Sequence, residues 1–332
     1  MSPEICPASH AAGEVWTYAV PLRTRFRGIV VREGMVWRGP AGWAEWSPFL
    51  DYQGAEIRPW LRAADEAAET GWPAAVRDRI PVNSTVPATD PEHAARIVTE
   101  AGCGTAKVKV AETGQGLAED VARVEAVRDA LGPSGGLRVD ANGGWSVDQA
   151  EAAIGSLHRF GLEYVEQPCR TVEELAELRL RLARRGRHVL IAADESIRRV
   201  EDPYRVAQLG AADIAVLKVQ PLGGVRACLE IAERIGLPVV VSSALETSVG
   251  IRAGLALAAA LPELPYACGL NTVALLTDDL VVAPLFAVDG FLPVADVEAD
   301  PVALDRNRAA ADRDRFWQAR LMQTRALGRP GG

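Results

Sequence analysis

The chain has 332 residues, of which 48% are hydrophobic and 24% charged, and its formal net charge is −8. This composition is typical of a globular protein and excludes a disordered or fibrous chain. An acidic chain lacks the basic face that nucleic-acid binding needs, so we expect no nucleic-acid partner. The most apolar run, residues 253–261, is too short to cross a bilayer, so we expect no membrane span.

Cysteine and histidine give no sign of a metal or disulfide framework. The five cysteines are widely spaced and form no CxxC pair, and the four histidines are scattered. Residues 1–14 lack the basic and apolar regions of a signal peptide. We therefore expect a protein of the reducing cytoplasm; its oligomeric state cannot be read from these features.

The first 80 residues predict an α+β module. Strand-like runs fill residues 15–45, and a helical pattern follows over residues 56–79. The run GIVVREGMVWRG, residues 28–39, has Gly34 at its centre and predicts a hairpin that turns there.

From residue 81 the pattern changes to short aliphatic strands that alternate with amphipathic helices. The predicted strands cover residues 81–86, 105–110, 137–142, 162–168, 188–196, 214–220, 238–246 and 267–272. Eight strands that alternate with helices favour an α/β fold, a (β/α)7β TIM-like barrel over residues 81–285, with the N-terminal module as a capping domain. A doubly wound open sheet is the alternative, but the chain has no Gly-x-Gly-x-x-Gly after the first strand. Residues 286–332 break the pattern and end in a charged helix, roughly 305–326, that we expect to return to the cap.

Three carboxylates, Asp140, Glu166 and Asp194, end successive predicted strands at intervals of 26 and 28 residues. Because strands of a parallel barrel are buried, charges there are costly unless they are paired or bind a metal. Oxygen donors without Cys or His suit Mg²⁺ or Mn²⁺. Each acid alone is better explained as a helix cap or a loop acid, but three in register favour a metal site at the carboxyl face.

Lys107 and Lys109 alternate on one strand, so both side chains point to the same face. Repulsion between two ammonium groups predicts a lowered pKa for one of them, which makes a usable base near pH 7. Lys218 ends a later strand and is expected across the barrel from Lys109. The alternative is an edge strand with solvated lysines. A divalent cation between lysines suits removal of a proton next to a carboxylate, because the metal takes up charge as the enolate forms.

Taken together, these motifs resemble the enolase superfamily, in its muconate-lactonising-enzyme subgroup. The matching pieces are Lys107-Val-Lys109, Asp140-Ala-Asn142, Glu166-Gln-Pro168, Asp194-Glu195-Ser196 and Lys218, in family order. The resemblance implies a capped (β/α)7β barrel, Asp140, Glu166 and Asp194 as metal ligands, and Glu195 behind them. It also implies Lys109 and Lys218 as catalytic lysines that face each other across the substrate, with Lys107 tuning Lys109.

Within the subgroup, the stretches SSALETSVG and GLNT most resemble an actinobacterial dehydratase branch. That branch implies a syn dehydration of 2-succinyl-6-hydroxy-2,4-cyclohexadiene-1-carboxylate in menaquinone synthesis. Candidate substrate-binding residues are Ser242 and Ser243 with the backbone N–H groups after them, Asn142, and Arg23 from the cap. The alternatives for these residues are plain turn serines and a solvated cap strand.

Other functions stay open at this point. An N-succinylamino-acid racemase would use the same site, with Lys109 and Lys218 as two bases. A muconate cycloisomerase or an acid-sugar dehydratase comes next, and the acid-sugar dehydratase is disfavoured because no histidine follows His188. A non-catalytic metal-binding homologue is disfavoured by the intact lysine and carboxylate set.

Overall fold

The computed structural model describes residues 14–26, 28–198 and 202–327. Residues 1–13, which are all but the last residue of the segment assessed for a signal peptide, lie outside this range. Among the described residues, no helix combines the length and apolar character that a membrane span requires.

The N-terminal segment forms a three-stranded antiparallel sheet followed by a helix. The strands are β1 (Val15–Phe26), β2 (Ile29–Gly39) and β3 (Gly42–Trp46), and after the short η1 (Gly54–Ile57) comes α1 (Arg58–Glu69). Tryptophan and alanine side chains pack between this sheet and α1, with Trp46 and Trp60 fully buried. The predicted helix over 56–79 is therefore shorter, and it ends before Gly71, which has a φ of +65°.

The hairpin predicted at Gly34 is wrong, because β2 runs straight through this residue. Gly34 serves a close approach instead of a turn. A Cβ atom built there would lie 2.5 Å from the Ser47 Cβ and 2.7 Å from the Tyr18 hydroxyl. The chain reverses between β2 and β3, at residues 40–41.

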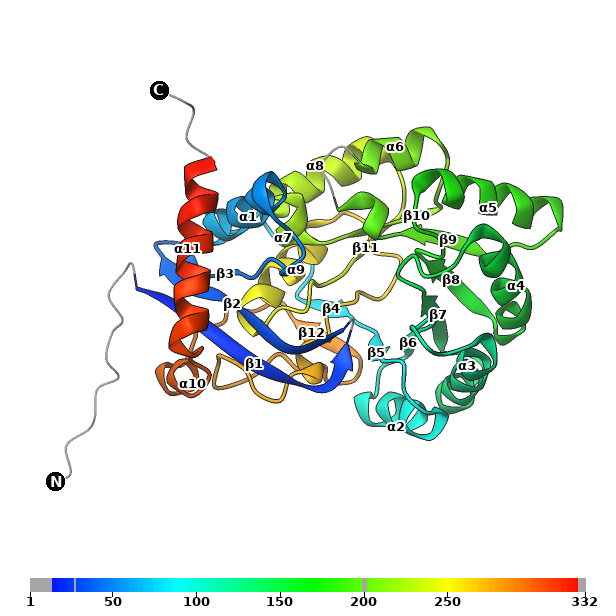
Figure 1. Ribbon diagram of the computed structural model, residues 1–332, viewed down its shortest axis with the longest axis horizontal. Coiled ribbons are helices and arrows are strands. Elements are labelled where there is room, and N and C mark those ends of the chain that lie inside the picture. Colours follow the sequence, from blue (N-terminus) through cyan, green and yellow to red (C-terminus); the bar gives the residue numbers. More distant parts are fainter. Residues whose placement is uncertain (1–13, 27, 199–201, 328–332) are drawn as a thin grey trace.

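A curled, seven-stranded parallel sheet follows, with helices on its outer face (Figure 1). Its strands lie side by side in chain order: β5 (Ser84–Val86), β6 (Thr105–Lys109), β7 (Gly136–Asp140), β8 (Leu162–Glu166), β9 (Leu190–Ala193), β10 (Ile214–Leu217) and β11 (Val239–Val241). This order excludes the doubly wound alternative, in which the strand order reverses. The intervening helices are α2 (Pro91–Ala101), α3 (Leu117–Leu131), α4 (Val147–Leu157), α5 (Val172–Arg184), α6 (Asp202–Gln208), α7 (Val219–Leu222), α8 (Val225–Ile235) and α9 (Ser248–Ala260).

The chain segment around Cys268 contacts both edges of this sheet. Cys268 forms a parallel bridge with Val82, next to β5, and Gly269 forms one with Ser242, next to β11. The Asn83 N–H donates to the Cys268 carbonyl at 3.0 Å. One short segment thus hydrogen-bonds to the first and the last strand.

The C-terminal segment packs against the cap strands. β12 (Phe291–Pro293) pairs with β4 (Arg79–Pro81), and α10 (Pro301–Arg306) and α11 (Ala311–Leu327) follow. Figure 1 shows α11 beside β1 and β2, where Trp317 stands edge-on to Trp46, with 5.6 Å between ring centroids. Arg313 forms an ion pair with Glu33 of β2.

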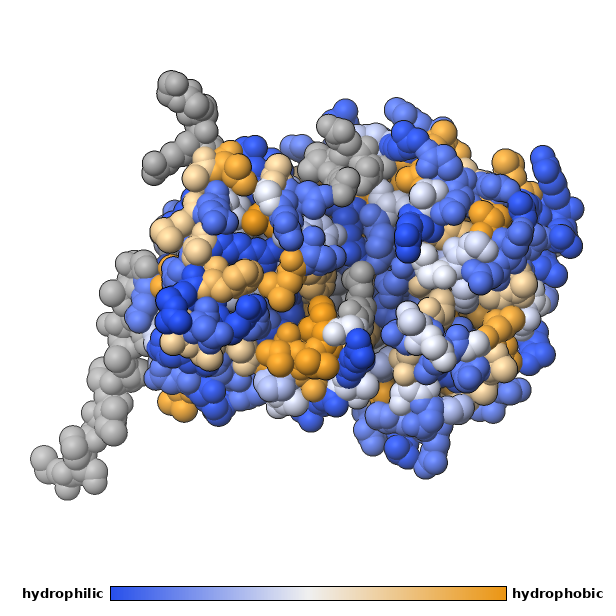
Figure 2. Space-filling view, in the orientation of Figure 1, coloured by the Kyte–Doolittle hydropathy of each residue, from blue (hydrophilic) through white to orange (hydrophobic). Residues whose placement is uncertain are grey.

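In Figure 2 hydrophobic residues gather over the β1–β2 hairpin, where Val30 is 58% exposed.

Candidate active site

A pocket lies at the carboxyl ends of the parallel strands, under the cap. The sheet contributes to its wall Thr85, Lys107, Lys109, Asp140, Lys218 and Ser242. The cap contributes Phe26, Ile29 and Phe49. This is the face at which barrel enzymes place their active sites.

Strand register brings the lysines of β6 to the carboxylates of β7 and β8. Lys109 is paired in register with Asp140, and Asp140 with Glu166. The Lys109 Nζ lies 2.5 Å from Asp140 Oδ2. The Lys107 Nζ lies 2.8 Å from Glu166 Oε1 and 3.5 Å from Asp140 Oδ2. As predicted, both lysines point to the same face, and both are buried.

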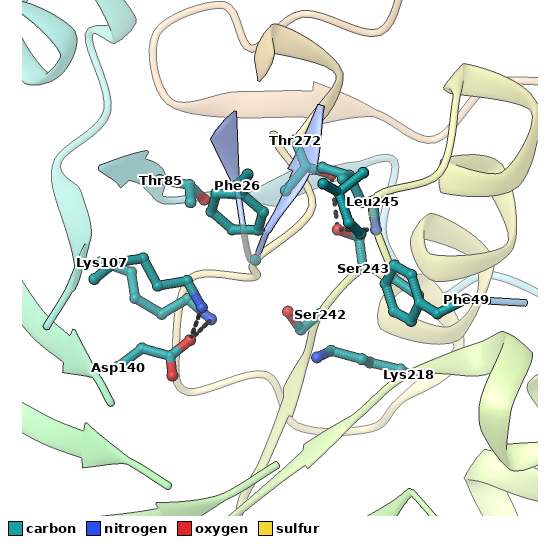
Figure 3. Close-up of a pocket in the computed structure, with 14 residues that line it drawn as sticks. Phe26, Phe49, Thr85, Lys107, Asp140, Lys218, Ser242, Ser243, Leu245 and Thr272 are labelled. Atoms are coloured by element: carbon teal, nitrogen blue, oxygen red, sulfur yellow. Dashed lines mark hydrogen bonds and ion pairs between the residues drawn. The ribbon is translucent and has the colours of Figure 1, made fainter. Parts of the chain in front are cut away.

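The third lysine enters from the opposite side. The Lys218 Nζ lies 2.6 Å from Asp194 Oδ2. Figure 3 shows Lys107 and Lys218 on opposite sides of the pocket, with their ammonium groups pointing inward. The chain contains no lysine besides Lys107, Lys109 and Lys218. Lysine scarcity is therefore a sequence signal for this site.

The carboxylates perturb one another. Burial and the nearby Asp140 and Asp194 raise the pKa of Glu166 to about 7, although Lys107 opposes them. Burial also acts to raise the pKa of Asp140, but Lys109 and Lys107 outweigh it and hold that pKa below its usual range. The sequence predicts a lowered pKa for one lysine of the pair, but the pKa of Lys107 is not lowered. Burial lowers its pKa, but Glu166 and Asp140 raise it more strongly, well above the ordinary value.

A hydrogen-bonded chain supports this cluster from behind. Lys109 donates to Asn142 Oδ1 at 2.7 Å, and Asn142 Nδ2 donates to Glu195 Oε1 at 3.0 Å. Arg198 donates to the same Glu195 oxygen at 2.6 Å and to the Tyr52 hydroxyl at 3.1 Å. Asn142 has a φ of +47°, a conformation that asparagine tolerates better than most residues. Sequence reasoning found Asn142 and Glu195 but missed Arg198, which stands in a turn without a recognisable pattern.

The two predicted serines reach the pocket, but their backbone N–H groups are already committed. The Ser242 N–H donates to the Leu217 carbonyl at 2.9 Å, and the Ser243 N–H donates to the Gly269 carbonyl at 3.1 Å. Ser242, Ser243 and Thr272 line the pocket, and a 2.7 Å hydrogen bond joins Ser243 Oγ to Thr272 Oγ1. The N–H groups after them are committed as well, because the Ala244 N–H donates to Glu246 Oε2 at 2.6 Å and the Leu245 N–H donates to Ser243 Oγ at 3.3 Å.

The structure does not bring Arg23 to the pocket. Alternation along β1 leaves Arg23 and Arg25 exposed, whereas Phe26 is buried and lines the pocket. The Lys109 Nζ lies 5.1 Å from the centroid of the Phe26 ring, a cation–π contact that sequence reasoning missed.

The donor set suits a hard divalent cation. Asp140, Glu166 and Asp194 offer only carboxylate oxygens, the ligands that Mg²⁺ and Mn²⁺ prefer. Over residues 14–26, 28–198 and 202–327, no three His, Cys, Asp or Glu side chains already stand at metal-ligand spacing. The ammonium groups of Lys109, Lys107 and Lys218 instead contact Asp140, Glu166 and Asp194, respectively.

Comparison with known proteins agrees with this fold and site. Residues 90–299 match the family model described as enolase C-terminal domain-like, and residues 17–68 match the one described as enolase N-terminal domain-like. A solved structure of muconate lactonizing enzyme from Pseudomonas putida superposes with a TM-score of 0.73 at 23% identity, covering 89% of this chain and 98% of that one. The chain therefore belongs to the enolase superfamily, whose enzymes bind small-molecule substrates.

Curated relatives narrow this assignment. A protein of Thermobifida fusca, named o-succinylbenzoate synthase, is 62% identical over 93% of this chain and 95% of its own length. One of Mycolicibacterium smegmatis with the same name is 54% identical over 93% of this chain and 94% of its own. Within the superfamily, the chain groups with the o-succinylbenzoate synthases.

Proposed function

We propose that the protein is an o-succinylbenzoate synthase, a carbon–oxygen lyase. It removes water from 2-succinyl-6-hydroxy-2,4-cyclohexadiene-1-carboxylate, and the ring becomes aromatic. This step belongs to menaquinone synthesis. The observation that carries the proposal is that three lysines lining one pocket contact three buried carboxylates, Asp140, Glu166 and Asp194, in a chain 62% identical to a named synthase.

Asp140, Glu166 and Asp194 would hold the divalent cation, Mg²⁺ or alternatively Mn²⁺. When bound, the cation supplies Lewis-acid stabilisation of charge on the substrate carboxylate. Glu166 supports this assignment, because its pKa of about 7 reflects burial beside two further acids. A cation among these acids would relieve their mutual repulsion.

Lys109 takes the proton next to the substrate carboxylate and then returns a proton to the departing hydroxide on the same face. Asn142 fixes the Lys109 ammonium through its 2.7 Å hydrogen bond. Lys218 stays cationic on the other side of the pocket and stabilises the enolate electrostatically. Lys107, held between Glu166 and Asp140, tunes Lys109. Ser242 and Ser243 bind a substrate oxygen through their hydroxyl groups.

The proposal extends to the architecture. We infer that the parallel sheet closes into a (β/α)7β barrel, with the segment around Cys268 as its eighth strand; the two bridges of that segment support this. Residues 1–80 and 286–332 would then form the cap, and residues 81–285 the barrel. The described cysteines, Cys103, Cys169, Cys228 and Cys268, are free thiols, which suits a reducing cytoplasm.

The test is ultraviolet absorbance of the purified protein with the cyclohexadiene substrate and Mg²⁺. We expect rapid loss of the diene band, abolished by a chelator and by Lys109→Ala. The control is Arg96→Ala, which changes an exposed residue of α2 and should leave the rate unchanged. A wild-type protein that binds Mg²⁺ but leaves the diene intact would refute the proposal. Racemisation of N-succinylamino acids would then be the next activity to assay.

A further inference from the structure

A buried arginine ties the cap to one wall of the pocket. Arg32 lies on β2 and is only 3% exposed. Its Nε donates to the Leu245 carbonyl at 2.9 Å, and its Nη2 donates to the Ala244 carbonyl at 3.1 Å and to the Ser47 carbonyl. One guanidinium therefore holds a cap loop and the loop after β11 together. Its planar set of fixed donors makes this possible.

The loop that Arg32 holds is conformationally strained. Leu245 has a φ of +64°, a left-handed backbone conformation that is uncommon and strained for a residue with a Cβ. Its N–H donates to Ser243 Oγ at 3.3 Å, and the neighbouring Ala244 N–H donates to Glu246 Oε2 at 2.6 Å. Such a turn persists only where its surroundings fix it, and Arg32 supplies the bonds on its carbonyl side.

The same guanidinium also fixes an aromatic wall residue. The Arg32 Cζ lies 4.8 Å from the centroid of the Phe49 ring, and Phe49 lines the pocket. Figure 3 shows Phe49, Ser243 and Leu245 together on one side of the pocket, with Lys107 and Asp140 on the other. What Arg32 positions is therefore the wall opposite the lysine pair of β6.

We infer that Arg32 is a positioning residue: it clasps the Ala244–Leu245 turn and Phe49 into one wall, which binds the succinyl arm of the substrate, remote from the reacting carbons. This inference rests on the proposed function, since the arm belongs to that substrate. A wall that contacts only the remote arm binds ground state and transition state alike. Loosening it should raise KM and leave kcat nearly unchanged.

Arg32→Lys tests this clasp. Lysine keeps the positive charge near the buried carboxylates of Glu45 and Glu246, but one ammonium cannot reproduce the fork of donors. We expect KM to rise about tenfold or more, with kcat within about threefold, because charge-assisted hydrogen bonds are lost. The matched control is Arg38→Lys on the same strand, where Arg38 is half exposed and pairs with Glu298. That variant should keep wild-type KM.

Two further measurements keep the inference falsifiable. Arg32→Met combined with Glu246→Gln removes the cation and one neighbouring acid together, and should show the same rise in KM if Arg32→Lys does not fold. Amide hydrogen exchange of the peptide that contains Ala244 and Leu245 should speed up in both variants, without any substrate.

The outcomes separate the two proposals. An inactive wild-type enzyme with a protected turn that loosens in Arg32→Lys would refute the proposed function and keep the clasp. Active, folded variants with wild-type KM and wild-type exchange would overturn the clasp. A fall in kcat at unchanged KM would also overturn it, because it indicates a merely structural role.

Discussion

Glu246 makes the stability of the protein depend on pH. Its side chain is buried under the cap, and burial together with the neighbouring Glu45 raises its pKa to about 7, against an ordinary value of 4.5. Arg32 opposes this shift but does not cancel it. Each tenfold change in proton affinity corresponds to about 1.4 kcal/mol, so ionising Glu246 costs the folded state about 3 kcal/mol.

The sign of the effect follows from which state binds the proton. Below pH 4.5 Glu246 is protonated in both the folded and the unfolded protein, and its contribution is constant. Between pH 4.5 and 7 the unfolded chain releases the proton while the folded protein keeps it, so the free energy of unfolding falls as pH rises. Above pH 7 the destabilisation is complete.

Glu246→Gln should remove this dependence. We expect the variant to gain stability relative to the wild type as pH rises from 4.5 to 8, by up to about 3 kcal/mol. Thermal unfolding across this range measures the difference, with Glu298→Gln, a change at an exposed acid, as the control. Parallel curves for Glu246→Gln and the wild type would show that the reasoning about this carboxyl is wrong.

Three further predictions concern a close approach, a buried cation and the metal. Gly34→Ala should lower the free energy of unfolding by about 1–3 kcal/mol, measured by urea denaturation, because a Cβ there would meet the Ser47 side chain. Arg138→Met should cost about 1–3 kcal/mol by the same measurement, since it removes the fully buried side chain that donates to the Ala267 carbonyl at 2.7 Å; an unchanged midpoint would contradict this. Glu166→Gln should weaken Mg²⁺ binding in isothermal calorimetry, and undiminished affinity would remove Glu166 from the ligand set.

Most of the sheet and the charged centre could be predicted from the sequence. The strands that end in Asp140 and Glu166 are short aliphatic runs closed by a charge, and a buried strand leaves such a charge few explanations. Strand register then places Asp140 beside Glu166, because neighbouring parallel strands bring their carboxyl ends to the same edge of the sheet. This is local information, and the sequence contains it.

Contacts between distant segments could not be predicted. Arg32 donates to the carbonyl of Leu245, 213 residues away, and a backbone acceptor leaves no trace in side-chain patterning. Gly34 misled for a related reason, because the side chains that require a glycine there come from β1 and from the segment after β3. Arg23 was expected to reach the substrate from the cap, but it lies on β1, where the alternation of side chains exposes it and buries Phe26.

Lysine confined to the pocket has a practical consequence for studying this protein. The only lysines are Lys107, Lys109 and Lys218, and arginine and histidine have no primary amine. Amine-directed reagents therefore react only at the amino terminus and in the pocket. Reductive methylation with ¹³C-formaldehyde would place a separate nuclear magnetic resonance probe on Lys107, Lys109 and Lys218. Titration with metal or substrate could then be followed at each of these amines directly, free of overlap from surface lysines.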